Sequence, residues 1–275
     1  TRIADQSEVG SFSGSNYRIV RNVTYATRGT RALKADLYLP TTLGIHPAIV
    51  TIHGGGWRAG TRAAQATEAA EFAARGYVVL NIDYRLAPAD PWPAAIHDAK
   101  SAVYWLRRNA ATHQIDPNQI GAYGYSAGGQ LSLMLGLTDS SAGLEGPDAT
   151  AGGLGSKIQA VAAGGPPTDF RDQPLNSQEY AYFLGGTRAQ VPQAYQQASP
   201  AAWVSSQDAP TFMYVGAWDS TVNATKVARM HDLLRAAGVA SELVVLPRQN
   251  HVAALWDPAA FLKAVRFLDT HLKSP

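Results

Sequence analysis

The residues Gly124-Tyr125-Ser126-Ala127-Gly128 form a Gly-x-Ser-x-Gly pattern, which is typical of a nucleophilic serine. In this pattern the serine occupies a strained turn between a strand and a helix, and the two glycines leave room that side chains would fill. The pentapeptide alone is weak evidence, since about one random chain in ten of this length would contain it. Its context is stronger, because an apolar run precedes it and helix-forming residues follow it. The pattern therefore predicts a nucleophile at Ser126.

A serine hydroxyl needs a base to remove its proton, and a histidine does this well when a carboxylate holds its ring. We prefer His251, because it lies in a predicted loop that follows the strand at 242–246 and precedes the last predicted helix. This places it at the carboxyl edge of the sheet, on the same side as Ser126. The other histidines have structural interpretations as helix, turn or loop residues: His46, His53, His97, His113, His231 and His271.

Asp219 is the preferred acid, because it follows the predicted strand at 211–216 and lies on a loop at the same edge. The chain order serine, acid, histidine is the order expected of an α/β-hydrolase. Asp169 is the alternative acid, since it follows the predicted strand at 158–164. Asp83 and Asp98 are poorer candidates, because both precede the serine in the chain.

The segment His53-Gly-Gly-Gly-Trp57 supplies candidate donors for the oxyanion that forms when a carbonyl is attacked. Consecutive glycines allow backbone amides to approach a ligand oxygen closely. We expect the amides of Gly55, Gly56 and Ala127 to form this oxyanion hole. An alternative interpretation is a nucleotide site, because Gly54-x-Gly56-x-x-Ala59 fits a loose dinucleotide pattern and Asp83 ends the next strand, where an acid that binds ribose could lie. That interpretation does not account for the serine turn.

Strands and helices alternate through most of the chain, which predicts an open α/β sheet of about eight strands. Two alternating segments at 17–25 and 31–40 predict an N-terminal antiparallel hairpin. Continuous apolar runs predict buried parallel strands at 48–53, 77–83, 120–125, 158–164, 211–216 and 242–246. Helical patterns between them predict crossovers on both faces of the sheet at 61–75, 93–111, 127–137, 222–237 and 258–272.

Domain organisation is predicted to be simple, because no linker or internal repeat divides residues 1–275. We therefore expect a single domain with a polar, loosely held arm at residues 1–16. The longest interruption of the pattern is 165–208, with a short helix expected near 178–184. Because it leaves the end of a parallel strand, we expect this insert to be a partial lid over the site, the alternative being a packed surface loop.

Composition excludes several classes of function. The 275 residues include 23 basic and 21 acidic side chains without long runs, which argues against nucleic acid or an anionic membrane as partner and favours a small neutral substrate. The chain has no cysteine, so disulfides, thiol catalysis and thiolate metal sites are excluded. No apolar run approaches the length of a membrane span. The first residue is threonine, which favours a secreted or periplasmic protein that has lost a signal peptide. The oligomeric state is left open.

Four motifs together resemble the bacterial esterases related to hormone-sensitive lipase. They are His53-Gly-Gly-Gly-Trp57, Asp83-Tyr-Arg-Leu-Ala-Pro88, Pro93-Ala-Ala-Ile-His-Asp98 and Gly124-Tyr-Ser-Ala-Gly-Gly129. The resemblance implies an α/β-hydrolase fold and carboxylester hydrolysis by Ser126, His251 and Asp219, usually of short acyl chains. The short, strand-like leader and Trp57 are closer to the branch with little cap, which includes feruloyl and acetyl-xylan esterases and arylformamidases.

The predicted function is therefore a serine carboxylesterase that needs no metal or organic cofactor and acts on short-chain esters, including carbohydrate-linked ones. Trp57, Tyr125 and Trp218 are candidate aromatic walls of the substrate site, although core packing is the more common role of such residues. An arylformamidase or a peptidase-like acyl hydrolase would share every catalytic residue. A non-catalytic ligand-binding protein of the same fold is a further alternative, and such proteins normally lack one member of the triad.

Overall fold

The computed structural model describes residues 9–10, 16–149 and 155–273. The expected N-terminal arm, residues 1–16, lies almost wholly outside these residues. Within the described residues, nine strands form one sheet in the order β1-β2-β3-β5-β4-β6-β7-β8-β9. The strands are β1 (Val9–Gly10), β2 (Tyr17–Arg28), β3 (Arg31–Pro40), β4 (His46–Ile52), β5 (Val78–Ile82), β6 (Ile115–Tyr125), β7 (Ala160–Gly164), β8 (Thr211–Gly216) and β9 (Ser241–Leu246). The predicted sheet of about eight strands is confirmed, with the two-residue β1 added at one edge.

Strand direction divides the sheet into two parts. β1, β2 and β3 pair antiparallel, and β3 pairs antiparallel with β5. From β5 to β9 every neighbouring pair is parallel. Every residue of β5, β7 and β8 is buried, as their continuous apolar runs predict. The N-terminal hairpin and the mostly parallel sheet are thus both confirmed.

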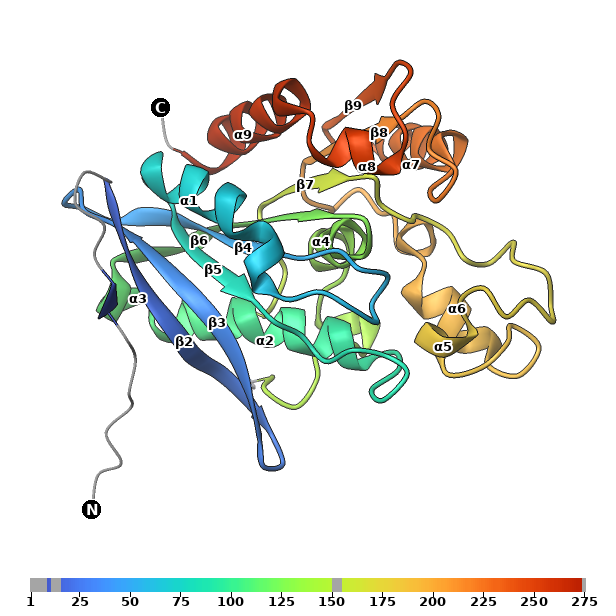
Figure 1. The fold of residues 1–275 in the computed structure, drawn as a ribbon, viewed down its shortest axis with the longest axis horizontal. Helices are drawn as coiled ribbons and strands as arrows, with labels where there is room; N and C mark the ends of the chain where they lie inside the picture. The colour runs from blue at the N-terminus through green and yellow to red at the C-terminus, as the bar shows by residue number, and fades with distance from the viewer. Residues whose placement is uncertain (1–8, 11–15, 150–154, 274–275) are drawn as a thin grey trace.

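Helices cover both faces of the sheet (Figure 1). Apolar residues of α1, α8 and α9 join the core on one face, and those of α2, α4 and α7 join the core on the other. These helices are α1 (Ala66–Ala74), α2 (Ala94–Arg108), α4 (Ala127–Leu137), α7 (Ala224–Ala236), α8 (His251–Leu255) and α9 (Pro258–Leu272). Shorter ones are η1 (Arg62–Gln65), α3 (Ala110–His113), η2 (Ser140–Ala142), α5 (Ala181–Leu184), α6 (Pro192–Ala198) and η3 (Pro200–Ala202).

The segment 165–208 contains α5, α6 and η3 and lies at one end of the molecule (Figure 1). It is anchored by buried apolar side chains, among them Phe170, Phe183 and Tyr195. The ring of Phe183 stacks on Trp57 with 4.0 Å between centroids. This contact joins the segment to the loop after β4, at the carboxyl edge of the sheet. Its role as a partial lid stays a prediction.

Candidate active site

Ser126 lies between β6 and α4 in a conformation that few residues adopt. Its backbone angles are φ 55° and ψ −120°, so the residue is strained, as a nucleophile on a strand-to-helix turn is expected to be. A Cβ on Gly124 would lie 2.4 Å from the main chain of Gly128, and a Cβ on Gly128 would lie 2.0 Å from the carbonyl oxygen of Ile52. The predicted need for glycine on both sides of Ser126 is therefore confirmed.

His251 lies beside this serine, with its Nε2 2.9 Å from Ser126 Oγ. It was expected in a loop, but it is the first residue of the short helix α8. Asn250 caps this helix by accepting a hydrogen bond from the Ala253 amide at 2.9 Å. The Tyr125 hydroxyl donates to the His251 carbonyl at 2.6 Å. Helix geometry, the cap and this bond together fix the backbone that carries the imidazole.

Asp219 completes a continuous hydrogen-bonded chain. Its Oδ2 lies 2.6 Å from His251 Nδ1, while its Oδ1 accepts bonds from the amides of Thr221 at 2.9 Å and Val222 at 2.8 Å. The carboxylate is fully buried. Because an ionised carboxylate only accepts, Nδ1 of His251 carries the hydrogen and Nε2 is free to accept from Ser126. The structure thus brings together the three residues predicted as nucleophile, base and acid.

The other carboxylates considered from the sequence have different partners. Asp169 pairs with Arg171 through bonds of 2.8 and 2.7 Å. Burial opposes its ionisation, but the bonds from Arg171 outweigh this and lower the pKa of Asp169. Asp98 pairs with Arg85 at 2.8 Å. Asp83 accepts from the Arg62 amide at 2.7 Å and from its guanidinium. Its engagement by Arg62 argues against the ribose-binding role of the nucleotide interpretation.

The glycine loop after β4 faces Ser126. Gly55 and Gly56 line a cavity together with Ser126 and His251. The loop is held from both sides, because His53 Nδ1 donates to the Gly54 carbonyl at 2.7 Å and Tyr182 donates to the Gly56 carbonyl at 2.9 Å. Ala127 is the first residue of α4, where backbone amides have no partner within the helix. The arrangement suits an oxyanion hole, and the roles of these three amides stay predictions.

The three aromatic residues predicted as substrate walls lie differently. Trp57 is 2% exposed, stacks on Phe183 and donates its indole hydrogen to Gln130 at 3.1 Å. Tyr125 is also 2% exposed, and its hydroxyl holds the backbone of His251 by donating to the carbonyl. Trp218 is 66% exposed and lines none of the cavities described next. Although both rings are almost fully buried, Tyr125 lines the apolar cavity and Trp57 lines the small cavity described next. The role of the three residues as substrate walls stays a prediction.

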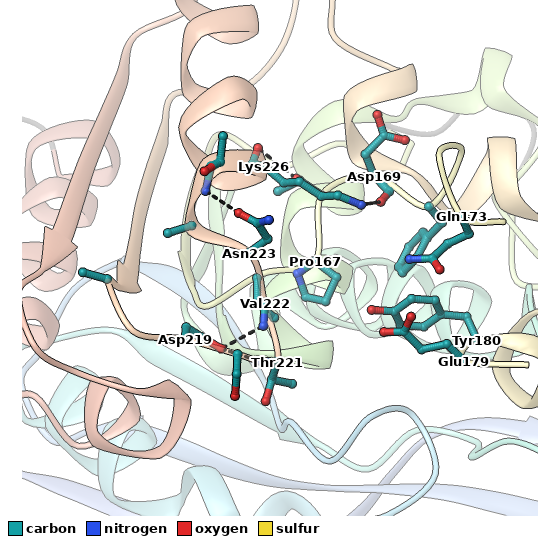
Figure 2. A pocket seen from close by; sticks show the side chains of 16 residues that line it. Pro167, Asp169, Gln173, Glu179, Tyr180, Asp219, Thr221, Val222, Asn223 and Lys226 are labelled. Atoms are coloured by element: carbon teal, nitrogen blue, oxygen red, sulfur yellow. Dashed lines mark hydrogen bonds between the residues drawn. The ribbon is translucent and has the colours of Figure 1, made fainter. Parts of the chain in front are cut away.

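Three cavities meet near Ser126. An apolar cavity of about 400 Å³ is lined by the glycine loop, Ser126, His251, Val252 and Leu255. A polar cavity of about 490 Å³ lies between residues 167–180 and the loop that follows β8 (Figure 2). A smaller cavity of about 240 Å³ contains Ser126 and shares Thr221 with both of the others. The serine therefore stands where an apolar and a polar space join.

Comparison with known proteins assigns the family. Residues 35–234 match the BD-FAE family model. The chain belongs to the BD-FAE family. The BD-FAE match includes Ser126 and Asp219 and ends before His251.

Relatives of this BD-FAE chain agree with the assignment. Esterase LipC of Mycobacterium tuberculosis is 32% identical over 226 residues, which are 78% of this chain and 54% of LipC. The chain thus spans about half the length of that relative. A structure described as a truncated carbohydrate esterase from gut microbiota matches with a TM-score of 0.86 and 25% identity, over 95% of this chain and 99% of that chain. Esterase Est2 of Thermogutta terrifontis matches with a TM-score of 0.75 and 25% identity, over 96% and 90%. The fold is that of the α/β-hydrolases.

Two further observations concern the described residues as a set. None of their helices is long and apolar enough to span a bilayer. Among the same residues, no cluster of three or more His, Cys, Asp or Glu side chains could hold a metal ion.

Two supports of the site were missed from the sequence. One is the Tyr125 hydroxyl, which holds the His251 carbonyl, and the other is Asn250, which caps α8. The second had a signal, because asparagine directly before a helical residue is a common N-cap. The first had none, since sequence spacing cannot show where a hydroxyl points.

Proposed function

We propose that this protein is a serine carboxylesterase that hydrolyses acyl esters of carbohydrates. The observation that carries the reaction class is the hydrogen-bonded chain from Ser126 through His251 to Asp219. The relatives described above are esterases, which agrees with this class.

The proposed reaction has two steps. His251 Nε2 takes the proton of Ser126 as Oγ attacks the ester carbonyl carbon, and the amides of Gly55, Gly56 and Ala127 stabilise the oxyanion. The tetrahedral intermediate collapses, the bond to the alcohol oxygen breaks, and that oxygen receives the proton from His251. Water then attacks the acyl-enzyme, giving its proton to His251, and Ser126 regains a proton as the carboxylic acid leaves. Asp219 keeps the imidazole in the productive tautomer and stabilises its protonated form.

The two main cavities support a substrate with two unlike halves. The apolar cavity beside the glycine loop suits a short acyl group, acetyl or larger. The polar cavity offers hydrogen-bonding side chains, and Figure 2 shows Gln173, Glu179 and Asn223 around it. A polyhydroxylated alcohol matches such a wall, because each hydroxyl both donates and accepts. The similarity to a carbohydrate esterase supports the same choice.

The test is hydrolysis of p-nitrophenyl esters from acetate to laurate, methyl ferulate and acetylated xylobiose by wild type and Ser126→Ala. We expect release by the wild type and at least about a thousandfold loss in the variant, because the nucleophile is missing. Equal release by both proteins would overturn the proposal. Faster cleavage of N-formylkynurenine than of any ester would instead identify an arylformamidase that uses the same residues.

A further inference from the structure

A fourth cavity continues the apolar one away from Ser126. This distal cavity has a volume of about 290 Å³ and is lined by residues of α1 on one side and of α8 and α9 on the other. Leu255, the last residue of α8, lines both the distal cavity and the apolar cavity at Ser126, which we call the proximal cavity. On the opposite side, η1 contributes Gln65 to the proximal cavity and α1 contributes Glu68 to the distal one. The two cavities therefore follow each other along the same pair of walls.

Two polar residues in these walls, Gln65 and Glu68, are almost fully buried. Gln65 is 2% exposed and Glu68 is 7% exposed. Gln65 Oε1 and Glu68 Oε2 are buried and have no hydrogen-bond partner among the described residues. Burial raises the pKa of Glu68, which disfavours its charged form. Most of the surface that lines the two cavities is apolar, so the walls are suited to an apolar ligand.

Apolar side chains also stand exposed along the rim of the two cavities. Val252 is 64% exposed beside the proximal cavity, and Trp256 and Leu262 are 64% and 43% exposed beside the distal one. Exposed apolar groups that border a cavity gain most from a ligand that covers them. The rim and the walls therefore favour the same kind of occupant.

We propose that the distal cavity binds the outer methylenes of the acyl chain, so that the site accepts medium-length as well as short acyl groups. The proposal rests on the proposed function, because Ser126 must hold the acyl carbonyl for the chain to extend this way. In a carbohydrate ester the acyl group is the apolar half, and the polar cavity on the other side of Ser126 suits the sugar. The proximal and distal cavities together form what we call the apolar groove. Each methylene that moves from water into this groove raises kcat/KM about fourfold.

The experiment uses two esters that each contain an eight-carbon chain, which is on the acyl side in methyl octanoate and on the alcohol side in octyl acetate. The variant is Leu262→Asp, which puts a charge into the distal cavity. The matched control is Leu43→Asp, since Leu43 is 95% exposed and lines neither cavity. We expect kcat/KM for methyl octanoate to fall about fifteenfold in Leu262→Asp relative to that for octyl acetate, which corresponds to losing the burial of about two methylenes. The control should keep the wild-type ratio.

An unchanged ratio in Leu262→Asp would overturn the proposal, and so would a selective loss of octyl acetate, which would place the alcohol in the groove. A second measurement does not depend on turnover. Octanoate is titrated into Ser126→Ala while tryptophan fluorescence is followed, with acetate as the reference ligand. We expect a saturable change with octanoate that disappears in Ser126→Ala/Trp256→Phe. If octanoate causes no saturable fluorescence change, the proposed binding of the acyl chain in the groove is wrong. If the change is present but ester hydrolysis does not depend on Ser126, the proposed function is wrong while the apolar binding site is retained.

Discussion

The apolar groove and the polar cavity on either side of Ser126 are built in different ways. The distal part of the groove is formed by regular helices, α1 facing α8 and α9, and its proximal part is formed by the glycine loop, η1 and α8. The polar cavity is formed by two irregular segments, 167–180 and the loop 217–226, in which several polar groups are bonded to neighbouring backbone. Under the proposed function this difference has a purpose, because the packing of helices would select one half of the ester and the chemistry of the loops would select the other.

The largest expected effect concerns the two acids that border the polar cavity, Asp219 and Asp169. The uncharged amide in Asp219→Asn stabilises a protonated imidazole less than the carboxylate does. It can also donate to His251 Nδ1, which would favour the unproductive tautomer with the hydrogen on Nε2. We expect kcat to fall about ten-thousandfold for every ester. Asp169→Asn should leave kcat within about tenfold, since Asp169 is paired with Arg171. Steady-state kinetics on p-nitrophenyl acetate check both. A near-normal kcat in Asp219→Asn together with an inactive Asp169→Asn would mean that Asp169, not Asp219, is the acid that orients His251.

A smaller effect is expected at Tyr125, whose side chain supports His251 between the apolar groove and the polar cavity. Tyr125→Phe removes the hydroxyl that donates to the His251 carbonyl at 2.6 Å and leaves that acceptor without this partner. The free energy of unfolding should fall by about 1 kcal/mol, and kcat should fall about tenfold because the imidazole loses one of its supports. KM should change little. Urea unfolding and kinetics on the same preparation separate the two effects, and an unchanged kcat would show that the α8 cap alone positions His251.

The polar side is tested by Glu179, which lines both the polar cavity and the small cavity at Ser126. Glu179→Gln weakens an acceptor for sugar hydroxyls, so kcat/KM for acetylated xylobiose should fall about fivefold, the effect of about one net hydrogen bond. The value of kcat/KM for p-nitrophenyl acetate should stay close to that of the wild type, because its leaving group has no sugar hydroxyls. Glu242→Gln, an exposed substitution on β9, is the control. Equal losses on both substrates would argue against recognition of the alcohol by this wall.

Much of the fold followed from the sequence because long, continuous signals are robust. The predicted bounds of β8, α4 and α9 agree with the structure. The short helices α6 and α8, of seven and five residues, were missed because they are too short to show a periodic pattern. β6 begins at Ile115, before its apolar run, since Ile115 pairs with His46. Local pattern does not report such pairing.

The site was predictable where function depends on position along the chain. Ser126, Asp219 and His251 all follow strands, and parallel strands end at the same edge, so their proximity could be expected from strand order. The direction in which a ring points could not. Trp57 was a candidate for the substrate wall, and Phe183 from a distant segment stacks on it, so the ring is mostly buried while Trp57 still lines the small cavity at Ser126. Gln65 and Leu255 carried no motif, because the groove exists only where two separate helices face each other.

The smallest expected effect concerns His53, which lies under the glycine loop at the start of the groove. It is 1% exposed, stacks on Tyr84 and has a buried Nε2 without a partner among the described residues. Burial lowers the pKa of His53 below its ordinary value of 6.5. The unfolded chain therefore binds a proton at a higher pH than the folded protein does, and the free energy of unfolding should decrease as pH falls below about 6.5.

His53→Gln keeps a donor for the Gly54 carbonyl but does not titrate. Urea unfolding at about pH 7.5 and about pH 5.5 should show a smaller loss in the variant than in the wild type. Part of the loss should persist, because burial also lowers the pKa of His97, His113 and His271. Equal losses in the two proteins would mean that His53 accepts its proton without disturbing the loop, and the apolar side would then tolerate charge next to the oxyanion donors.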